Sequence, residues 1–106
     1  MSAGFGCSSP EKRIGYFVVA EEASLFETEI DNLRFDTWVD DSELDEAQKI
    51  ALYEICNKII VNSKGNSYKY CKVEFTGNLE ENGFFGHLGK YKQQIVLSDY
   101  KILAEK

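Results

Sequence analysis

The chain has 106 residues, which is the size of one domain, and 43% hydrophobic with 28% charged residues is typical of a folded globular protein. Its apolar runs fall short of the roughly 20 residues that a membrane-spanning helix needs. The formal charge is −6, yet residues 1–57 hold 13 acids and 4 bases, and residues 58–106 hold 5 acids and 8 bases. This asymmetry can orient a partner, or it can reflect two solvated faces.

The three cysteines, Cys7, Cys56 and Cys71, form no metal-ligand spacing with the one histidine. An odd, sparse count predicts reduced and mostly buried thiols, and with them a cytoplasmic protein. An alternative is a bacterial envelope lipoprotein whose signal has been removed, because Cys7-Ser8-Ser9 looks like the start of such a mature protein. The first ten residues themselves lack the basic start and apolar core of a signal peptide.

Residues 1–11 are predicted to be a flexible tail, and residues 12–106 a single α+β domain. The continuous apolar run 14–20 predicts a buried, central strand. Residues 21–30 fit either a half-buried strand or a helical face, and strand or irregular structure is favoured. Residues 33–39 alternate cleanly and predict a further strand.

An acidic segment leads into a helix predicted over residues 45–60. Asp45 with Gln48, or Ser42 with Asp45, can form a capping box, which satisfies the first free backbone amides. The apolar stripe that would cover a sheet consists of Leu44, Ala47, Ala51, Leu52, Ile55, Cys56 and Ile59.

The chain after this helix predicts a hairpin. Residues 62–67 form a turn in which Gly65 can adopt a left-handed conformation. The inward positions of the next strand are Cys71, Val73, Phe75 and Leu79, and Gly77 suggests a bulge or a close backbone approach. Glycines 83, 86 and 89 are read as turn formers, and Ser98-Asp99 as a second bulge or kink.

These elements predict an α+β fold: a mainly antiparallel sheet, or a small OB-like barrel of 4–5 strands, packed against one amphipathic helix. If residues 21–30 form a strand, the order of elements is that of an OB barrel. The glycine-rich turn is then the loop between the last two strands, one of the usual ligand-binding loops of that fold.

Two surfaces are candidates for binding, and no catalytic or metal site is predicted. One is the glycine-framed aromatic loop, with Phe84, Phe85, His87, Lys90 and Tyr91. The other is an acidic rim over residues 40–46, with Asp40, Asp41 and Glu43. Helix capping explains the acids better than a cation, since the spacing of a calcium loop is absent. His87 has no evident partner for catalysis, so a ring that holds the loop through backbone contacts is favoured.

The segment Gly77-Asn-Leu79 followed by Asn82-Gly-Phe-Phe-Gly-His-Leu-Gly-Lys-Tyr91 resembles a pattern in small uncharacterised bacterial proteins, several of them lipoproteins. The resemblance covers about a third of the chain. It implies that five residues form a structural or ligand-facing signature: Gly86, His87, Leu88, Gly89 and Tyr91. It also favours an envelope protein, although the chain lacks the leading signal of the pattern.

The predicted function is a non-enzymatic binding protein of the inhibitor, immunity or adaptor type, which acts on another protein through the loop and the acidic rim. The alternative is an OB-like domain for single-stranded nucleic acid, because lysines and aromatics alternate in the second half. The negative net charge argues against that alternative. A small hydrolase or a metal-dependent enzyme is the third hypothesis. No cofactor is predicted, and the oligomeric state stays open.

Overall fold

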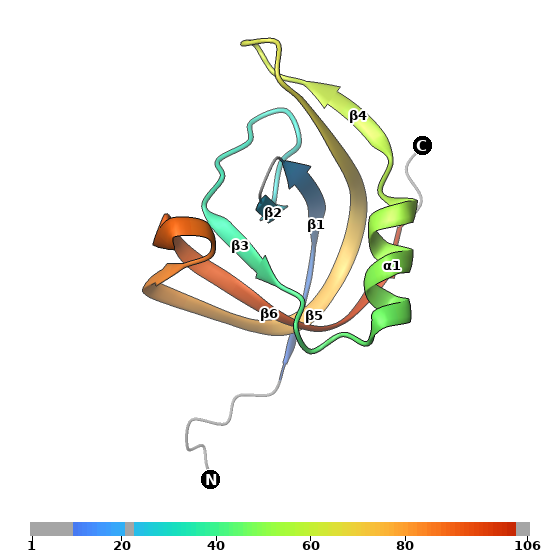
Figure 1. Ribbon diagram of the computed structural model, residues 1–106, viewed down its shortest axis with the longest axis vertical. Coiled ribbons are helices and arrows are strands. Elements are labelled where there is room, and N and C mark those ends of the chain that lie inside the picture. Colours follow the sequence, from blue (N-terminus) through green and yellow to red (C-terminus); the bar gives the residue numbers. More distant parts are fainter. Residues whose placement is uncertain (1–9, 21–22, 104–106) are drawn as a thin grey trace, which may run out of the picture.

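The computed structural model describes residues 10–20 and 23–103. In these ranges six strands, one α-helix and one short 3₁₀ helix follow one another (Figure 1). Their bounds are β1 Glu11–Ala20, β2 Ala23–Glu27, β3 Thr37–Asp40, α1 Glu46–Ile55, β4 Lys58–Val61, β5 Ser67–Phe85, η1 His87–Gly89 and β6 Tyr91–Ile102.

Five of the strands form a closed ring. They follow in the order β1, β2, β3, β6 and β5, and the pairing of β1 with β5 closes the ring. β3 and β6 run parallel, whereas the other neighbours are antiparallel. The prediction of a small, barrel-like α+β fold with one helix is confirmed. The sheet is mainly antiparallel, as predicted, with the β3–β6 pair as its parallel exception, and the expected 4–5 strands need correction for the whole sheet because β4 adds a sixth strand outside the five-stranded ring.

The N-terminal strands form where the sequence predicts strands, but their first and last residues differ from the predicted ones. β1 begins at Glu11, and residues 1–9 of the predicted tail lie outside the described residues. The ambiguous segment forms β2 over residues 23–27, so the strand reading is confirmed. The strand predicted over residues 33–39 is wrong in its first half, since residues 33–36 are irregular and β3 begins only at Thr37.

β5 and β6 form the predicted hairpin, and both predicted irregularities are present. Thr76 pairs with Asp99 and Gly77 pairs with Leu97, so Ser98 is the extra residue of a bulge. A Cβ atom on Gly77 would collide with the carbonyl oxygen of Val96. Glycine therefore permits the close backbone approach that the bulge requires.

The core fills the inside of the ring, where aromatic rings from β1, β2 and β5 contact one another. Phe17 and Phe26 both pack against Phe75, with ring centroids 5.7 and 5.5 Å apart. The buried residues of this cluster are Phe17, Phe26, Val39, Leu44, Leu52, Cys56, Cys71, Val73, Phe75, Ile95 and Leu97. Inward alternation is thereby confirmed for β5 at residues 71, 73 and 75.

The helix α1 is shorter than predicted. Its start is confirmed, because Asp45 caps it and forms the capping box with Gln48. It ends at Ile55, and the β-branched run that follows becomes β4, which pairs with residues 67–70 of β5. Valine and isoleucine favour strands over helices because their side chains are stiff at χ1. This preference explains why the predicted extension to residue 60 is wrong.

The helix faces the barrel with only part of its predicted apolar stripe. Leu44 and Leu52 are buried, whereas Ala47 and Ile55 are exposed. The hydroxyl of Tyr100 in β6 donates to the backbone carbonyl of Gln48 at 2.7 Å. These contacts place α1 against one part of the barrel, and in Figure 1 it lies on the opposite side from the loop that contains η1.

Cys56 and Cys71 form a disulfide bond, so the prediction of reduced thiols is wrong for these two residues. Both are buried, as predicted, and the bond joins the residue that caps the C-terminal end of α1 to β5. The thiol expected at Cys71 is therefore a covalent link between helix and barrel. Cys7 lies outside the described residues.

The disulfide closes a loop across a sequence separation of 15 residues. Loop-closure entropy then predicts that its loss lowers the free energy of unfolding by about 3 kcal/mol. We expect a reducing agent, or the double substitution Cys56→Ala and Cys71→Ala, to lower the melting temperature, with Cys7→Ser as the unaffected control. Titration of unreduced, denatured protein should find no free thiol from Cys56 or Cys71, so a count of three free thiols would contradict the bond.

Candidate functional site

The predicted loop, Gly83–Tyr91, is called the β5–β6 loop, and its backbone is fixed against Trp38 of β3. Gly86 has φ 71°, and a Cβ atom there would collide with the indole ring. Tyr91 packs on the same ring, with centroids 5.4 Å apart. Only glycine combines this conformation with this close approach. Gly83 lies within β5 rather than in the turn, which corrects its predicted role.

The aromatic and charged residues predicted for this loop are brought together, but they do not share one environment. Phe84 is 87% exposed and Leu88 is 80% exposed. Phe85 is half-buried and pairs with Tyr91 across the hairpin. His87 and Lys90 are exposed, and the N–H of Lys90 donates to the carbonyl of His87. The loop therefore presents two large apolar side chains to solvent on a backbone that packing holds in place.

The acidic rim lies elsewhere, where β3 leads into α1, and it does not meet the β5–β6 loop (Figure 1). Asp40 accepts a hydrogen bond from the N–H of Ser42 at 3.0 Å. Asp41 accepts one from the hydroxyl of Tyr53 at 3.3 Å. Glu43 is exposed. Two of the three predicted acids thus stabilise the turn and the helix that follow them.

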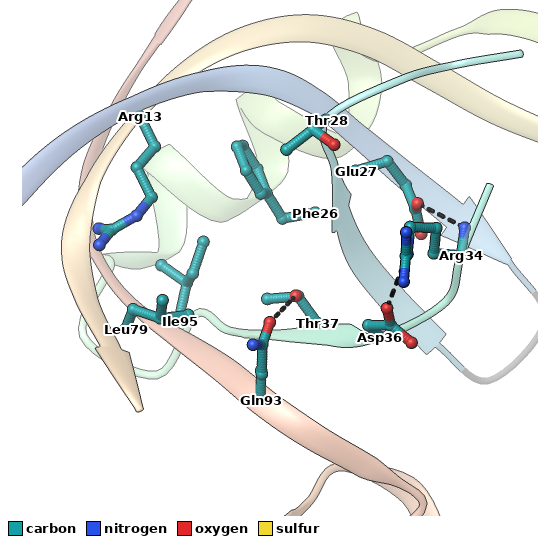
Figure 2. A pocket seen from close by; sticks show the side chains of 10 residues that line it. All are labelled: Arg13, Phe26, Glu27, Thr28, Arg34, Asp36, Thr37, Leu79, Gln93 and Ile95. Atoms are coloured by element: carbon teal, nitrogen blue, oxygen red, sulfur yellow. Dashed lines mark hydrogen bonds and ion pairs between the residues drawn. The ribbon is translucent and has the colours of Figure 1, made fainter. Parts of the chain in front are cut away.

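A pocket that the sequence did not predict opens at the end of the barrel away from α1 (Figure 2). Its volume is about 380 Å³, and all five strands of the ring contribute to it or to its border. Phe26, Leu79 and Ile95 supply its apolar surface. The remaining lining residues are polar or charged, namely Arg13, Glu27, Thr28, Arg34, Asp36, Thr37 and Gln93.

Glu27 is a buried carboxylate beside this pocket, with only 3% of its surface exposed. It accepts hydrogen bonds from the backbone N–H groups of Arg34 at 2.8 Å and Phe35 at 2.9 Å. Burial raises the pKa of the Glu27 carboxyl, and the two backbone hydrogen bonds oppose that rise. These bonds bend the chain after β2, where Phe35 has φ 56°. The alternation of residues 33–39 does not reveal this bend.

The two arginines of the pocket lie on different walls (Figure 2). Arg13 pairs with Glu11 of its own strand at 2.8 Å, and its side chain is 28% exposed. Arg34 pairs with Asp36 at 3.1 Å and is 70% exposed. The hydroxyl of Thr37 donates to the amide oxygen of Gln93 at 2.9 Å between these walls. In the sequence, Arg13 is marked only by its position just before the apolar run 14–20. It lies four residues before Phe17 in β1, so the two side chains lie on the same, inward face of the strand.

A second hollow, of about 340 Å³, lies outside the ring. Leu25 lines it, and neighbouring side chains of a strand point to opposite faces, so Leu25 faces away from the core that its neighbour Phe26 joins. Tyr91 of the β5–β6 loop reaches this hollow. Phe35 and Tyr68 also line it, and their rings pack with centroids 5.6 Å apart. Three aromatic rings from distant parts of the sequence thus meet at one surface.

The raised pKa of Glu27 predicts how the substitution Glu27→Gln changes stability with pH. A protonated carboxyl keeps acceptor lone pairs on both oxygens, whereas the amide nitrogen of glutamine cannot accept the second backbone N–H, so the variant should be less stable by a constant amount below pH 4.5, the ordinary pKa of the group. The stability of the natural protein should then fall, relative to the variant, as the pH rises through the raised pKa of the folded state. The stability advantage of the natural protein over the glutamine variant should therefore shrink between acid and neutral pH.

Chemical denaturation of both proteins across this pH range tests the prediction, because the other carboxyls cancel in the difference. Glu27→Ala is the contrasting variant, since it leaves two backbone N–H groups without their acceptor and should cost about 1–3 kcal/mol at every pH. A stability difference that instead widens in favour of the natural protein as the pH rises would show that the hydrogen bonds outweigh burial.

Three further properties bear on function: groups of metal ligands, membrane-spanning helices and similarity to known proteins. In residues 10–20 and 23–103, no three histidine, cysteine, aspartate or glutamate side chains group as metal ligands would. In the same part of the chain, no helix is long and apolar enough to cross a membrane. No family model, curated protein or solved structure was found to match the chain.

Proposed function

We propose that the protein is a non-enzymatic binding protein that contacts another protein through the β5–β6 loop. The observation that carries the proposal is the exposure of Phe84 and Leu88 on a loop held against Trp38. A backbone that is already held in place loses little entropy on binding, and aromatic side chains such as Phe84 are enriched at protein interfaces. This fits an inhibitor, immunity protein or adaptor.

The acidic rim is a second, separate contact surface in this proposal. Glu43 extends into solvent, whereas Asp40 and Asp41 already accept local hydrogen bonds. Exposed charges outside the apolar contact steer association more than they add to affinity. The rim therefore accelerates the approach of a basic partner, and the loop supplies the apolar contact.

The disulfide supports the envelope alternative over a cytoplasmic location. Structural disulfides persist in oxidising compartments and are rare in the cytosol. The Cys56–Cys71 bond and the resemblance of the β5–β6 loop to bacterial lipoproteins point in the same direction. A partner of this protein would then be another envelope protein.

A photo-reactive amino acid in place of Phe84 tests the interaction directly. Irradiation of cells that make the full chain should give a crosslinked product at this position. Ile59, which is 58% exposed on β4, is the matched control position and should not give that product. The double substitution Phe84→Ser and Leu88→Ser should change stability by no more than about 0.5 kcal/mol, as is usual for exposed sites. Equal crosslinking at both positions, or none at residue 84, would overturn the proposal.

A second candidate function is that of an OB-like domain binding single-stranded nucleic acid. The five-stranded ring and the position of the β5–β6 loop between its last two strands support the OB-like reading. The aromatic hollow lined by Phe35, Tyr68 and Tyr91 supplies rings on which bases can stack. The net charge of −6 weighs against it.

This candidate predicts that affinity for a thymidine oligonucleotide falls steeply as salt rises from about 50 to 200 mM. Tyr91→Ala should weaken binding by about 1–3 kcal/mol, the usual worth of one stacked base. Tyr70→Ala, at a tyrosine that packs on Tyr16 and does not line the hollow, is the control. A salt-independent affinity, or an equal loss in both variants, would exclude the stacking surface.

A further inference from the structure

The pocket at the open end of the barrel combines an apolar surface, formed by Phe26, Leu79 and Ile95, with polar and charged walls. The ring of strands closes its sides, and Phe26 and Ile95, both buried, belong at once to the core and to the pocket wall. Leu52 and Cys56 of the α1 region pack into the core from the other end. Barrel mouths of a few hundred cubic ångströms are common sites for small molecules.

Arg13 determines the kind of ligand that this pocket favours, namely an anion. It faces inward from β1, paired in register with Phe75, and Figure 2 shows its side chain along the wall above Leu79. Most of the side chain is buried. Among the described residues it forms an ion pair with Glu11, whose own side chain is 71% exposed. A guanidinium has five N–H donors, and this pair uses one nitrogen, Nη2. The remaining donors suit a planar anion.

The two acids of the pocket balance its two arginines in formal charge, so the preference depends on the local contacts of Arg13 and not on a net positive charge. The carboxylate of Glu27 already accepts two backbone N–H groups, and that of Asp36 pairs with Arg34. Arg34 stands on the opposite wall and is far more exposed than Arg13. Arg13 is therefore the group of the pocket that combines a mostly buried side chain with N–H donors that its ion pair does not use, and it lies beside the apolar side chain of Leu79.

We propose that the barrel mouth binds a small amphiphilic carboxylate, whose apolar body lies against Phe26, Leu79 and Ile95 and whose carboxylate binds Arg13. The site is distinct from the β5–β6 loop and does not depend on the function proposed for that loop. A medium-chain fatty acid anion combines the two chemical features, and its hydrocarbon chain is small enough for a pocket of about 380 Å³.

Calorimetric titration of the full chain with sodium octanoate tests the site, with octanol as the uncharged probe of the same chain length. We expect saturable binding of one octanoate, and octanol weaker by about 10- to 100-fold, the usual worth of hydrogen bonds to a charged group. Arg13→Gln should reduce octanoate affinity by a similar factor and leave octanol unchanged. Arg13→Lys should retain part of the affinity, because it keeps the charge and loses the planar fork.

Lys12→Gln is the matched control, since it removes the same charge from an exposed neighbour on β1. It should keep the octanoate affinity, as should the loop variant Phe84→Ser with Leu88→Ser, so that a failure of this proposal and a failure of the loop interaction are distinguishable. Amide shifts on octanoate binding should centre on Thr37, Gln93 and Ile95. Absence of saturable binding, equal affinity for octanol, an unaffected Arg13→Gln variant, or shifts centred elsewhere would each overturn the proposal.

Discussion

The pairing of β5 with strands on both of its edges is the constraint on which the rest of the structure depends. β5 joins β6 along one edge and β1 along the other, and near its start it also holds β4. A strand that does this must bend, and the bulge at Gly77 and Ser98 supplies a bend where it is needed. Without it the ring would stay open, and neither a packed core nor a barrel mouth would exist.

The periodic parts of the chain were predictable because their side chains alternate between core and solvent. The alternation of Cys71, Val73 and Phe75 identified the inner face of β5, and Gly77 marked its irregularity. The capping residues Asp45 and Gln48 located the start of α1. Its end was not predictable from apolar spacing, because Ile59 fits a helical stripe as well as a strand.

The candidate site was predictable only where glycines and aromatics crowd together in the sequence. The β5–β6 loop met that condition, although its anchor Trp38 lies far away in the chain. The barrel mouth did not, because its residues come from five strands and from the segment between β2 and β3, and they meet only when the ring closes. Glu27 was not predictable either, because an acid in an alternating strand usually faces solvent. Here the carboxylate is buried and accepts hydrogen bonds from the backbone N–H groups of residues 34 and 35.

The closed ring also has a consequence for the order in which the chain folds. The β5–β6 hairpin and the loop closed by Cys56 and Cys71 join residues that are close in sequence, so their entropic cost is small. The pairing of β1 with β5 joins Glu11 to Gly77, far apart in the chain, and contacts of this kind slow folding. We expect the pairing of β1 with β5 to form late, and until it does, the apolar residues that later line the core and the barrel mouth remain accessible to other chains.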